Sequence, residues 1–550
     1  MIYLIIKNKK NTNKMKNIRE KSKKLSIIFS IIWAINLLYG EMFAFWVPVF
    51  WTCSWPHLHS SSSLMSKGRS QNDYVKVAVV TDPQLMDRTS LPLAPKSLAL
   101  EIVQFYTDLY MRRAFLSSIM PFEPDAILFL GDYFDGGPML SNEDWQESLS
   151  RFKHIFDVGK KGRTKDVPVY YLSGNHDIGY AWHANHKPEV IERYESQFGR
   201  RNYRFSIGEV DFVAIDSQTV DGTADDIQTT RTWDFVKNLT TDVGARSRVL
   251  LTHMPLYRPD WTSCGPHRSS EIINQRILRS PYDQRIRYQN YVSDKSSSRL
   301  LDLVKPGLVL SGHDHDQCTV THKTEYGSAK EHTVGTISWQ QGNWYPSFML
   351  LSVRNFTLTD KSSSDPEILV RLCFLPIQLF IYMWYIALFV ITILALSFWP
   401  SQGIDIGHHC GRFMTNIKKL VLEGIFAKGS KEKNEDEECE YEMVWDAEGG
   451  MHLVKKPRSS SVASKETMNA TERGNAVMRP AKRQTLAPPE TAAKVDSGVD
   501  LGSSTAVMLQ RSSKSTMIIR RCVRVLGMVS VIALMNVPLY VMLLFKDWVE

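Results

Sequence analysis

Three long apolar runs constrain this chain of 550 residues more than any other feature. They cover residues 25–51, 372–399 and 525–545. Each run reaches the roughly 20 residues that a helix needs to cross a bilayer. A cleaved signal peptide is the alternative for the first run, but that run is longer than a usual signal core and no clean cleavage site follows it. We therefore expect an integral membrane protein with an uncleaved first anchor, in contact with the lipid bilayer.

Basic residues flank the apolar runs and predict the topology. Residues 1–24 are rich in Lys, and further Lys and Arg residues follow the second run and precede the third. Positive flanks stay in the cytosol. We therefore expect a cytosolic N-terminus (1–24), a Ser-rich linker (52–72), a lumenal domain (73–354) and a cytosolic segment (400–522). The last segment is polar and has no sustained apolar period, so we expect most of it to be disordered.

The charge distribution also separates classes of function. The net charge of +8 is modest for this length, and much of the excess lies beside the apolar runs. Because no basic stripe is present, the sequence does not predict nucleic-acid binding. Glu41 interrupts the first run, and an ionisable residue at membrane depth is expected to face protein or water, unless it lies near the interface.

Short β-branched stretches alternate with helical patterns in the lumenal block. The stretches cover residues 75–81, 126–130, 167–172, 249–252 and 308–311, and each ends at a polar motif. Their composition predicts buried strands. Helical patterns lie around residues 97–118 and 296–304. We therefore expect an α/β domain whose motif residues lie in loops beyond the strand ends.

Five polar motifs in a fixed order carry the chemistry. They contain carboxylates, an amide and imidazoles, which are ligands of divalent metals; they read Asp82-Pro83-Gln84, Gly131-Asp132-Tyr133-Phe134-Asp135, Gly174-Asn175-His176-Asp177, Thr252-His253, and Ser311-Gly312-His313-Asp314-His315. Each motif alone is weak, since Asp caps helices and His is often structural. Together they predict a phosphoesterase in which two metals, about 3.5–4 Å apart, activate a hydroxide for attack on phosphorus.

This set of motifs resembles the calcineurin-like metallophosphoesterase superfamily over about residues 75–354. The resemblance implies a β-sandwich flanked by helices, in four layers α/β/β/α. It implies that Asp132 bridges two metals. It assigns the remaining ligands as Asp82 and His315 for one metal, and Asn175, His253 and His313 for the other. It also implies that His176 faces the substrate phosphate as a catalytic group, oriented by Asp135.

One position departs from the superfamily pattern. Gln84 stands where the first motif usually has a His. An amide oxygen is a weaker ligand than imidazole, so this site is expected to favour harder ions such as Mn²⁺ or Mg²⁺ over Zn²⁺ or iron. The alternative is that Gln84 contacts a ligand rather than the metal.

The flanks of the motifs resemble a membrane branch of the superfamily that trims GPI anchors. The resemblance lies in residues 252–258, 310–318, 338–339 and 345–348, and in the Asp-Pro-Gln start. It implies a phosphodiesterase of the endoplasmic reticulum or early Golgi that removes ethanolamine phosphate from a mannose. The implied substrates are GPI-anchored proteins or the GPI glycolipid, and the implied cofactors are two divalent ions, with Mn²⁺ favoured.

Two alternatives to this function remain open at the level of sequence. The chain could act on another lumenal phosphoester or phosphoprotein, or it could be a non-catalytic trafficking scaffold. A purple-acid-type phosphatase would carry Tyr at the position of Asp135, which makes that class unlike this chain.

Three aromatic residues near the end of the domain have two possible roles. Trp339, Trp344 and Tyr345 could stack against a sugar or pack in the core.

Side chains outside the motifs add two expectations. Cys264 and Cys318 each follow a motif histidine, so they could form a disulfide in an oxidising lumen; two buried free thiols are the alternative. Glycosylation triplets begin at Asn238 and Asn355 in the expected lumenal block. A third triplet, at Asn469, falls in the expected cytosolic segment and is expected to remain unused.

Overall fold

The computed structural model describes residues 2–60, 74–94, 96–159, 164–181, 187–241, 246–270, 277–355, 368–398, 441–445, 451–455 and 504–549. The chain divides into two compact units, the first comprising residues 1–399 with 519–550 and the second residues 400–518. In the second unit, β14 (Tyr441–Trp445) pairs with β15 (Met451–Lys455) in an antiparallel hairpin. Most of the segment expected to be disordered, including Asn469, lies outside the described residues.

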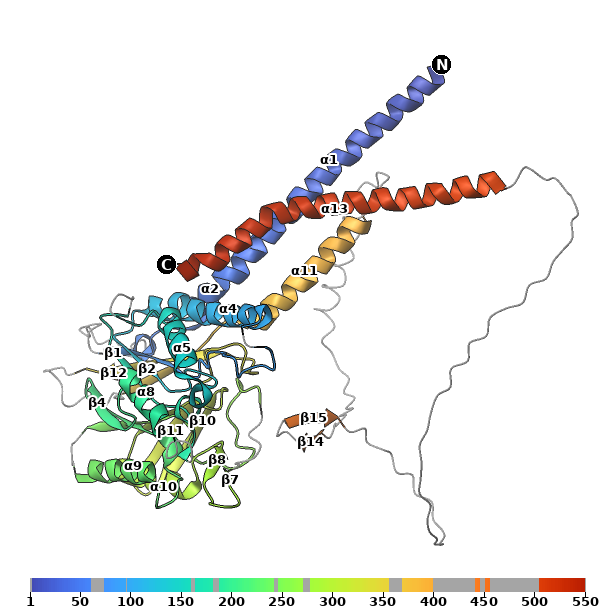
Figure 1. The fold of residues 1–550 in the computed structure, drawn as a ribbon. Helices are drawn as coiled ribbons and strands as arrows, with labels where there is room; N and C mark the ends of the chain where they lie inside the picture. The colour runs from blue at the N-terminus through green and yellow to red at the C-terminus, as the bar shows by residue number, and fades with distance from the viewer. Residues whose placement is uncertain are drawn as a thin grey trace, which may run out of the picture. The chain divides into compact units, whose positions relative to one another are not determined.

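Two sheets form the centre of the first unit (Figure 1). One has the strand order β13-β12-β1-β2-β3. Its strands are β1 (Tyr74–Val80), β2 (Ala126–Phe129), β3 (Val169–Tyr171), β12 (Ser347–Arg354) and β13 (Ile368–Phe374). The other has the order β10-β11-β9-β6-β5-β4. Its strands are β4 (Tyr203–Ile207), β5 (Val210–Ile215), β6 (Ser247–Thr252), β9 (Leu308–Ser311), β10 (Cys318–Thr324) and β11 (Gly327–Thr333).

Alternating side chains of β1 explain why the sheets stack. Val77 and Val79 belong to a buried cluster formed between the two sheets, whereas Ala78 and Val80 belong to a second cluster beneath the helices. Successive strand residues point to opposite faces, so a strand that is apolar at every position is buried on both. Each fully buried valine of this kind stabilises the fold by ~1.5–3 kcal/mol.

Helices cover the outer face of each sheet. On one side lie α4 (Leu98–Arg113), α5 (Asn142–Ile155) and α8 (Pro188–Phe198), and on the other α9 (Ile227–Asn238) and α10 (Asp294–Val304). Ser97, Ser141 and Ser293 cap α4, α5 and α10 by accepting a hydrogen bond from a first-turn backbone N–H. The layers therefore follow the order α/β/β/α, and the predicted fold class is confirmed.

The strand directions bring the motifs to one place. β1, β2 and β3 run parallel in one sheet, and β5, β6 and β9 run parallel in the other. The five predicted strands are all present, and the motif loops follow their carboxyl ends. Parallel strands deliver these ends to the same edge of a sheet, which is where ligands bind in such folds.

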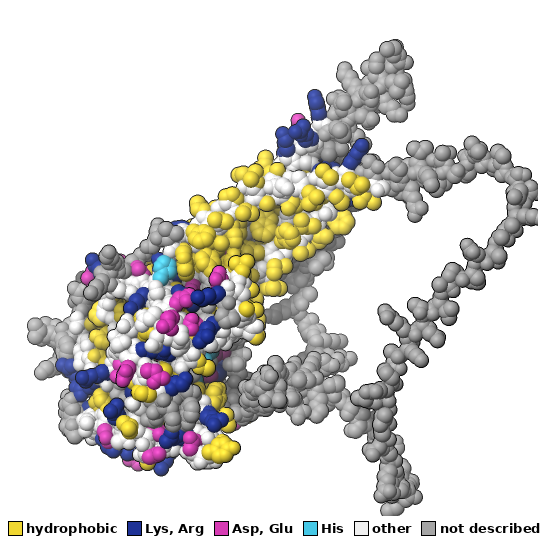
Figure 2. Space-filling model, viewed as in Figure 1, with side chains coloured by type: hydrophobic (Ala, Val, Ile, Leu, Met, Phe, Trp, Pro, Cys, Tyr) yellow, Lys and Arg dark blue, Asp and Glu magenta, His cyan; other side chains and the backbone are white. Residues whose placement is uncertain are grey.

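Within the part of the chain that the structure describes, three helices are long and apolar enough to cross a membrane: Arg19–Thr52, Gln378–Phe398 and Ile518–Trp548. The first comprises the end of α1 (Ile2–Leu38), a π-helical turn (Tyr39–Phe43) and α2 (Ala44–Thr52); the others are α11 (Gln378–Phe398) and most of α13 (Ser504–Val549). Figure 2 shows apolar side chains gathered along these helices, while charged side chains spread over the sheet domain and gather again at the far end of the apolar band. The helices indicate membrane association.

Two expected boundaries differ from the structure. Residues 368–374 form the edge strand β13, paired with β12, so the sheet domain extends past residue 354 and the second apolar helix begins at Gln378 rather than at 372. A short apolar stretch has no period that separates a strand from a helix. The expected linker is also partly structured, because Cys53 forms a disulfide with Cys373 and Trp55 packs into the core.

Candidate metal centre

The backbone at the motif residues is unusual. Asp82, Asp132, His313 and His315 adopt φ values of 50°, 57°, 66° and 55°. Non-glycine residues rarely adopt this left-handed conformation, and each costs on the order of 1–3 kcal/mol unless the surroundings hold it. The strand ends therefore hold these side chains in a geometry that the local sequence alone would not favour.

Glycines permit the close approach of the motif loops. A Cβ atom at Gly174 would lie 2.0 Å from Asp132 Oδ1, and one at Gly312 would lie 2.1 Å from Thr81 Oγ1. Either contact would push neighbouring loops apart. Gly174 and Gly312 are thus required because another loop of the site occupies the space of a side chain.

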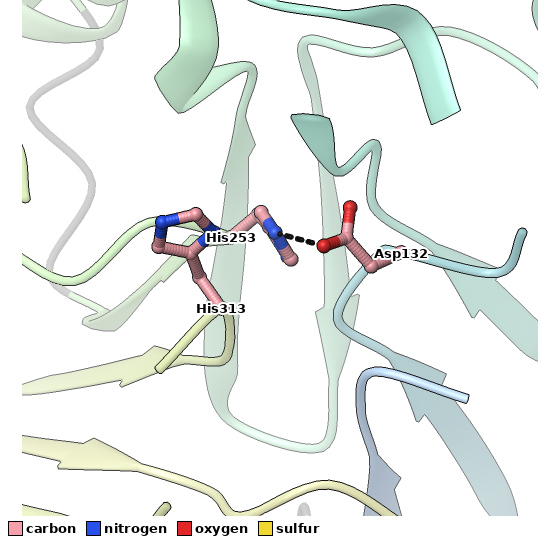
Figure 3. Close-up of side chains that lie close together, drawn as sticks. All are labelled: Asp132, His253 and His313. Carbon is pink, nitrogen blue, oxygen red and sulfur yellow. Dashed lines mark ion pairs between the residues drawn. The ribbon is translucent and has the colours of Figure 1, made fainter. Parts of the chain in front are cut away.

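Two groups of ligand atoms converge around one carboxylate. The first comprises Asp132, His253 and His313, and the second comprises Asp82, Asp132 and His315; within each, the ligand atoms lie within 4.8 Å of one another. In Figure 3 the ring of His253 lies between His313 and the carboxylate of Asp132. His253 Nε2 lies 3.1 Å from Asp132 Oδ2 and 3.2 Å from Asn175 Oδ1. Asp132 is therefore common to both groups, and Asn175 joins the first.

The two histidines of the last motif, His313 and His315, have ring nitrogen atoms that can bind a cation. His313 Nδ1 and His315 Nε2 are buried without a hydrogen-bond partner among the described residues. Burial lowers the pKa of His313 to about 3 and the pKa of His315 to about 4. Both rings are therefore neutral at pH 7, which is the form that binds metals.

The buried carboxylates of Asp82 and Asp132 make this site favourable for positively charged groups. Asp82 and Asp132 are fully buried, and burial raises the pKa of Asp82 to about 7. Burial opposes the charged form of His253, yet Asp132 and Asp82 raise the pKa of this histidine to about 9. Paired buried acids of this kind are stabilised by cations. The donor set and its charge therefore fit two divalent ions.

Comparison with known proteins identifies the domain. Residues 75–317 match the family model described as calcineurin-like phosphoesterase. The chain carries a calcineurin-like phosphoesterase domain. The superfamily predicted from the motifs is confirmed, and with it the enzyme class, a metallophosphoesterase.

Relatives resemble the chain beyond this domain. It is 28% identical to "Cell division control protein 1" of Saccharomyces cerevisiae over 344 residues, which cover 60% of this chain and 67% of that protein. It is 26% identical to "Metallophosphoesterase 1 homolog" of Drosophila melanogaster over 365 residues, or 63% and 86% of the two chains. It is also 26% identical to "Metallophosphoesterase 1" of Rattus norvegicus over 347 residues, or 59% and 79%.

His176 of the phosphoesterase domain stands beside Asp135. The Nδ1 atom of His176 hydrogen-bonds the carbonyl oxygen of Asp135 and lies 3.5 Å from its Oδ1. The backbone N–H of His176 donates to Asp132 Oδ1 at 2.8 Å. The side chain of His176 is 37% exposed. The ring is thus oriented through one nitrogen and can present the other to a substrate.

Asp177 has a role that the motif pattern did not reveal. Its carboxylate accepts backbone hydrogen bonds from Asp132, Tyr133 and Gly174, each 2.8 Å long. It is buried, and burial raises its pKa to about 7. Asp177 therefore joins two motif loops and positions the shared ligand. Its place as the last residue of the Gly-Asn-His-Asp motif was the available signal.

Gln84 contacts the ligand set. Its Nε2 donates to Asp132 Oδ2 at 3.2 Å, and its side chain is buried. This contact matches the alternative in which Gln84 touches a ligand. Asp314, by contrast, turns away from the ligands, because its carboxylate accepts from Arg268 at 2.7 Å and from Tyr291 at 3.1 Å.

The remaining candidate residues lie outside the ligand set. Cys264 and Cys318 form a disulfide that ties the loop after β6 to the start of β10. Asn238 is exposed at the end of α9, and Asn355 follows β12.

Proposed function

We propose that this chain is a membrane-anchored phosphodiesterase that removes ethanolamine phosphate from a mannose of GPI anchors during anchor remodelling. One observation carries the proposal: two groups of candidate metal ligands lie in a phosphoesterase domain that packs directly on three apolar helices. A substrate anchored in the same bilayer would meet this centre at a high effective concentration. The resemblance of the motif flanks to the GPI-trimming branch supports the choice of substrate.

The distribution of charge supports a lumenal domain in the endoplasmic reticulum or early Golgi. Lys21, Lys23 and Lys24 are exposed at the start of the first apolar helix, and Arg520 and Arg521 at the start of the third. Positive flanks stay in the cytosol. The opposite ends of these helices reach the phosphoesterase domain, so that domain would lie in the lumen.

The side chains have separable tasks in this proposal. Asp82 and His315 would hold one metal, Asn175, His253 and His313 would hold the other, and Asp132 would hold both. When bound, the two ions would polarise the phosphoryl group and neutralise the charge that develops on its oxygens. Asp177 keeps the backbone of Asp132 in place through its hydrogen bonds. We propose Mn²⁺, because carboxylate and amide oxygens favour hard ions.

His176 would complete the hydrolysis. The oxygen of a water molecule forms a new bond to phosphorus, and the bond between phosphorus and the mannose oxygen breaks. The water loses one proton to the solvent, and the mannose oxygen gains one. Asp135 holds Nδ1 of His176, so the other ring nitrogen can donate that proton. The products are a free mannose hydroxyl and ethanolamine phosphate.

Glycan mass spectrometry of GPI-anchored proteins tests the proposal. Cells lacking the gene should retain extra ethanolamine phosphate, and the wild-type chain should remove it. His176→Ala should fail to do so. His332→Ala is the matched control, since the ring of His332 bonds Thr319 on the β10–β11 ladder. Unaltered ethanolamine phosphate in the deleted cells would remove this substrate.

The second candidate is a different lumenal phosphoester or phosphoprotein. The observation that favours this second candidate is the metal-ligand set itself, because such a set does not select one leaving group. Full-length protein with Mn²⁺ would then hydrolyse bis(p-nitrophenyl) phosphate while the GPI anchors of deleted cells stay normal.

A further inference from the structure

A small cavity lies at the base of the phosphoesterase domain, where the domain meets the second apolar helix. It has a volume of about 160 Å³ and is formed by residues 339–346 and 377–379. Water occupies about 30 Å³ per molecule in the liquid, so the cavity has room for about five water molecules. This is the scale of a single sugar ring.

We propose that this cavity binds a neutral, hydroxyl-rich sugar ring of the membrane-anchored substrate, next to the phosphodiester that is cleaved. The inference deepens the proposed function and rests on it. No residue of the cavity belongs to the metal ligands, so the two can be tested separately.

Buried polar atoms around the cavity await partners. Trp339 Nε1, Gln340 Oε1, Gln378 Oε1 and both polar atoms of the Asn343 amide have no hydrogen-bond partner among the described residues. Gln378 is only 2% exposed. Buried polar groups in native proteins are nearly always paired. The set contains both donors and acceptors, and a sugar hydroxyl satisfies both kinds.

The chemistry of the lining indicates a neutral ligand. All the residues that line the cavity are uncharged, whereas a phosphate site is usually built around Lys or Arg. Trp344 is 45% exposed and contacts Phe380, while Trp339 packs edge-on against Tyr382 at 5.8 Å. An exposed indole beside amide groups offers an apolar face for ring C–H groups. Trp339 packs against the core, whereas Trp344 is exposed and is the side chain that can stack on a sugar.

The cavity is connected to both the metal centre and the membrane. Gln340 Nε2 donates to the carbonyl oxygen of Gln84 at 3.1 Å, and Gln84 in turn contacts Asp132. Gln378 begins α11, a candidate span, and Phe380 in its first turn is exposed. A sugar held between these two points would keep its phosphodiester substituent near the metals and its lipid in the bilayer.

Trp344→Ala and Asn343→Ala test the cavity in the full-length protein. For each variant we compare kcat/KM for a purified GPI glycolipid with kcat/KM for bis(p-nitrophenyl) phosphate. We expect the ratio of the first to the second to fall about tenfold. The reason is that the sugar is the part of the substrate that both side chains would contact, and the smaller substrate has no sugar. The loss should appear in KM. Trp261→Ala is the matched control, since this tryptophan is 67% exposed and lies outside the cavity. An unchanged ratio, or an equal loss on both substrates, would overturn the proposal.

A binding measurement separates this inference from the proposed reaction. Saturation-transfer NMR with a mannose disaccharide should detect contact with wild-type protein in nanodiscs, and Asn343→Ala should abolish it. Inositol phosphate and lipid headgroup alone serve as competing ligands. If the disaccharide binds but the glycolipid is not cleaved, the proposed reaction fails and the cavity stands. If the disaccharide does not bind, or if the lipid headgroup displaces it from the protein, the sugar site is refuted.

Discussion

Arg113 Nη1 lies 2.5 Å from Glu41 Oε2, and the two side chains are 3% and 1% exposed. Glu41 belongs to the π-helical turn of the first candidate span, and Arg113 ends α4 of the phosphoesterase domain. Arg113 also lies 3.2 Å from Asp547 of α13, and Tyr385 of α11 donates to Glu41 at 3.1 Å. One buried pair thus joins the domain to all three apolar helices, and Glu41 faces protein.

We expect Glu41→Gln to destabilise the full chain by about 3 kcal/mol, because removing one partner leaves a buried guanidinium poorly compensated. Thermal unfolding in nanodiscs measures the loss. The matched control is Asp225→Asn, whose partner Arg285 lies 3.6 Å away and whose side chain is 73% exposed; an exposed pair is worth about 0–1 kcal/mol. Equal effects of the two substitutions would contradict the role of the buried pair.

Asp132→Asn should reduce metal content from two ions per chain to at most one, because Asp132 is, among the described residues, the only ligand common to both groups. Elemental analysis of purified protein measures the content. His315→Ala should lose only one ion. A chain that keeps two ions after Asp132→Asn would contradict a shared ligand.

Gln84→His should bind the first metal about tenfold more tightly, since imidazole is the stronger ligand and His tolerates the left-handed backbone found at this position, where φ is 38°. Titration of the metal-depleted protein with Mn²⁺ and Zn²⁺ measures the affinity. Unchanged affinity would place position 84 outside the coordination sphere and leave its contact with Asp132 as its role.

Asp177→Asn should weaken metal binding about 10- to 100-fold, because residues that orient a ligand have effects of this size. An amide cannot accept all three of the backbone hydrogen bonds that Asp177 accepts. Asp125→Asn is a suitable control, since Asp125 accepts one exposed backbone hydrogen bond from Lys76. Metal titration on both variants would contradict the positioning role if their affinities were equal.

Alkylation should label at most three of the seven cysteines before reduction and all seven afterwards, because four form the disulfides Cys53–Cys373 and Cys264–Cys318. Intact mass measures the number of labels. Replacing both Cys264 and Cys318 with Ser should cost about 2–5 kcal/mol of stability. Labelling of more than three cysteines in unreduced protein would show that at least one disulfide does not form.

The local signals in the sequence proved sufficient for much of the site. The strand before Asp82 and the strand before Asp132 could be recognised from β-branched residues, and their carboxyl ends predicted that the motifs meet. Asp177 lay in a recognised motif, yet its role depends on three backbone N–H groups that only the folded loops bring together. The strand Ile368–Phe374 was missed because its apolar residues merge with those of the following helix.

The sequence by itself determined the class of metal ligands, the strands that carry them and three helices apolar enough to span a membrane. Residue type, spacing and hydrophobic period are encoded within a few neighbouring positions, so they can be recognised without a fold. Only the tertiary structure decided that Glu41 pairs with Arg113, that Cys53 joins Cys373 and that Gln340 contacts Gln84. These partners are far apart in the chain, and packing of the complete sheets and helices selects them.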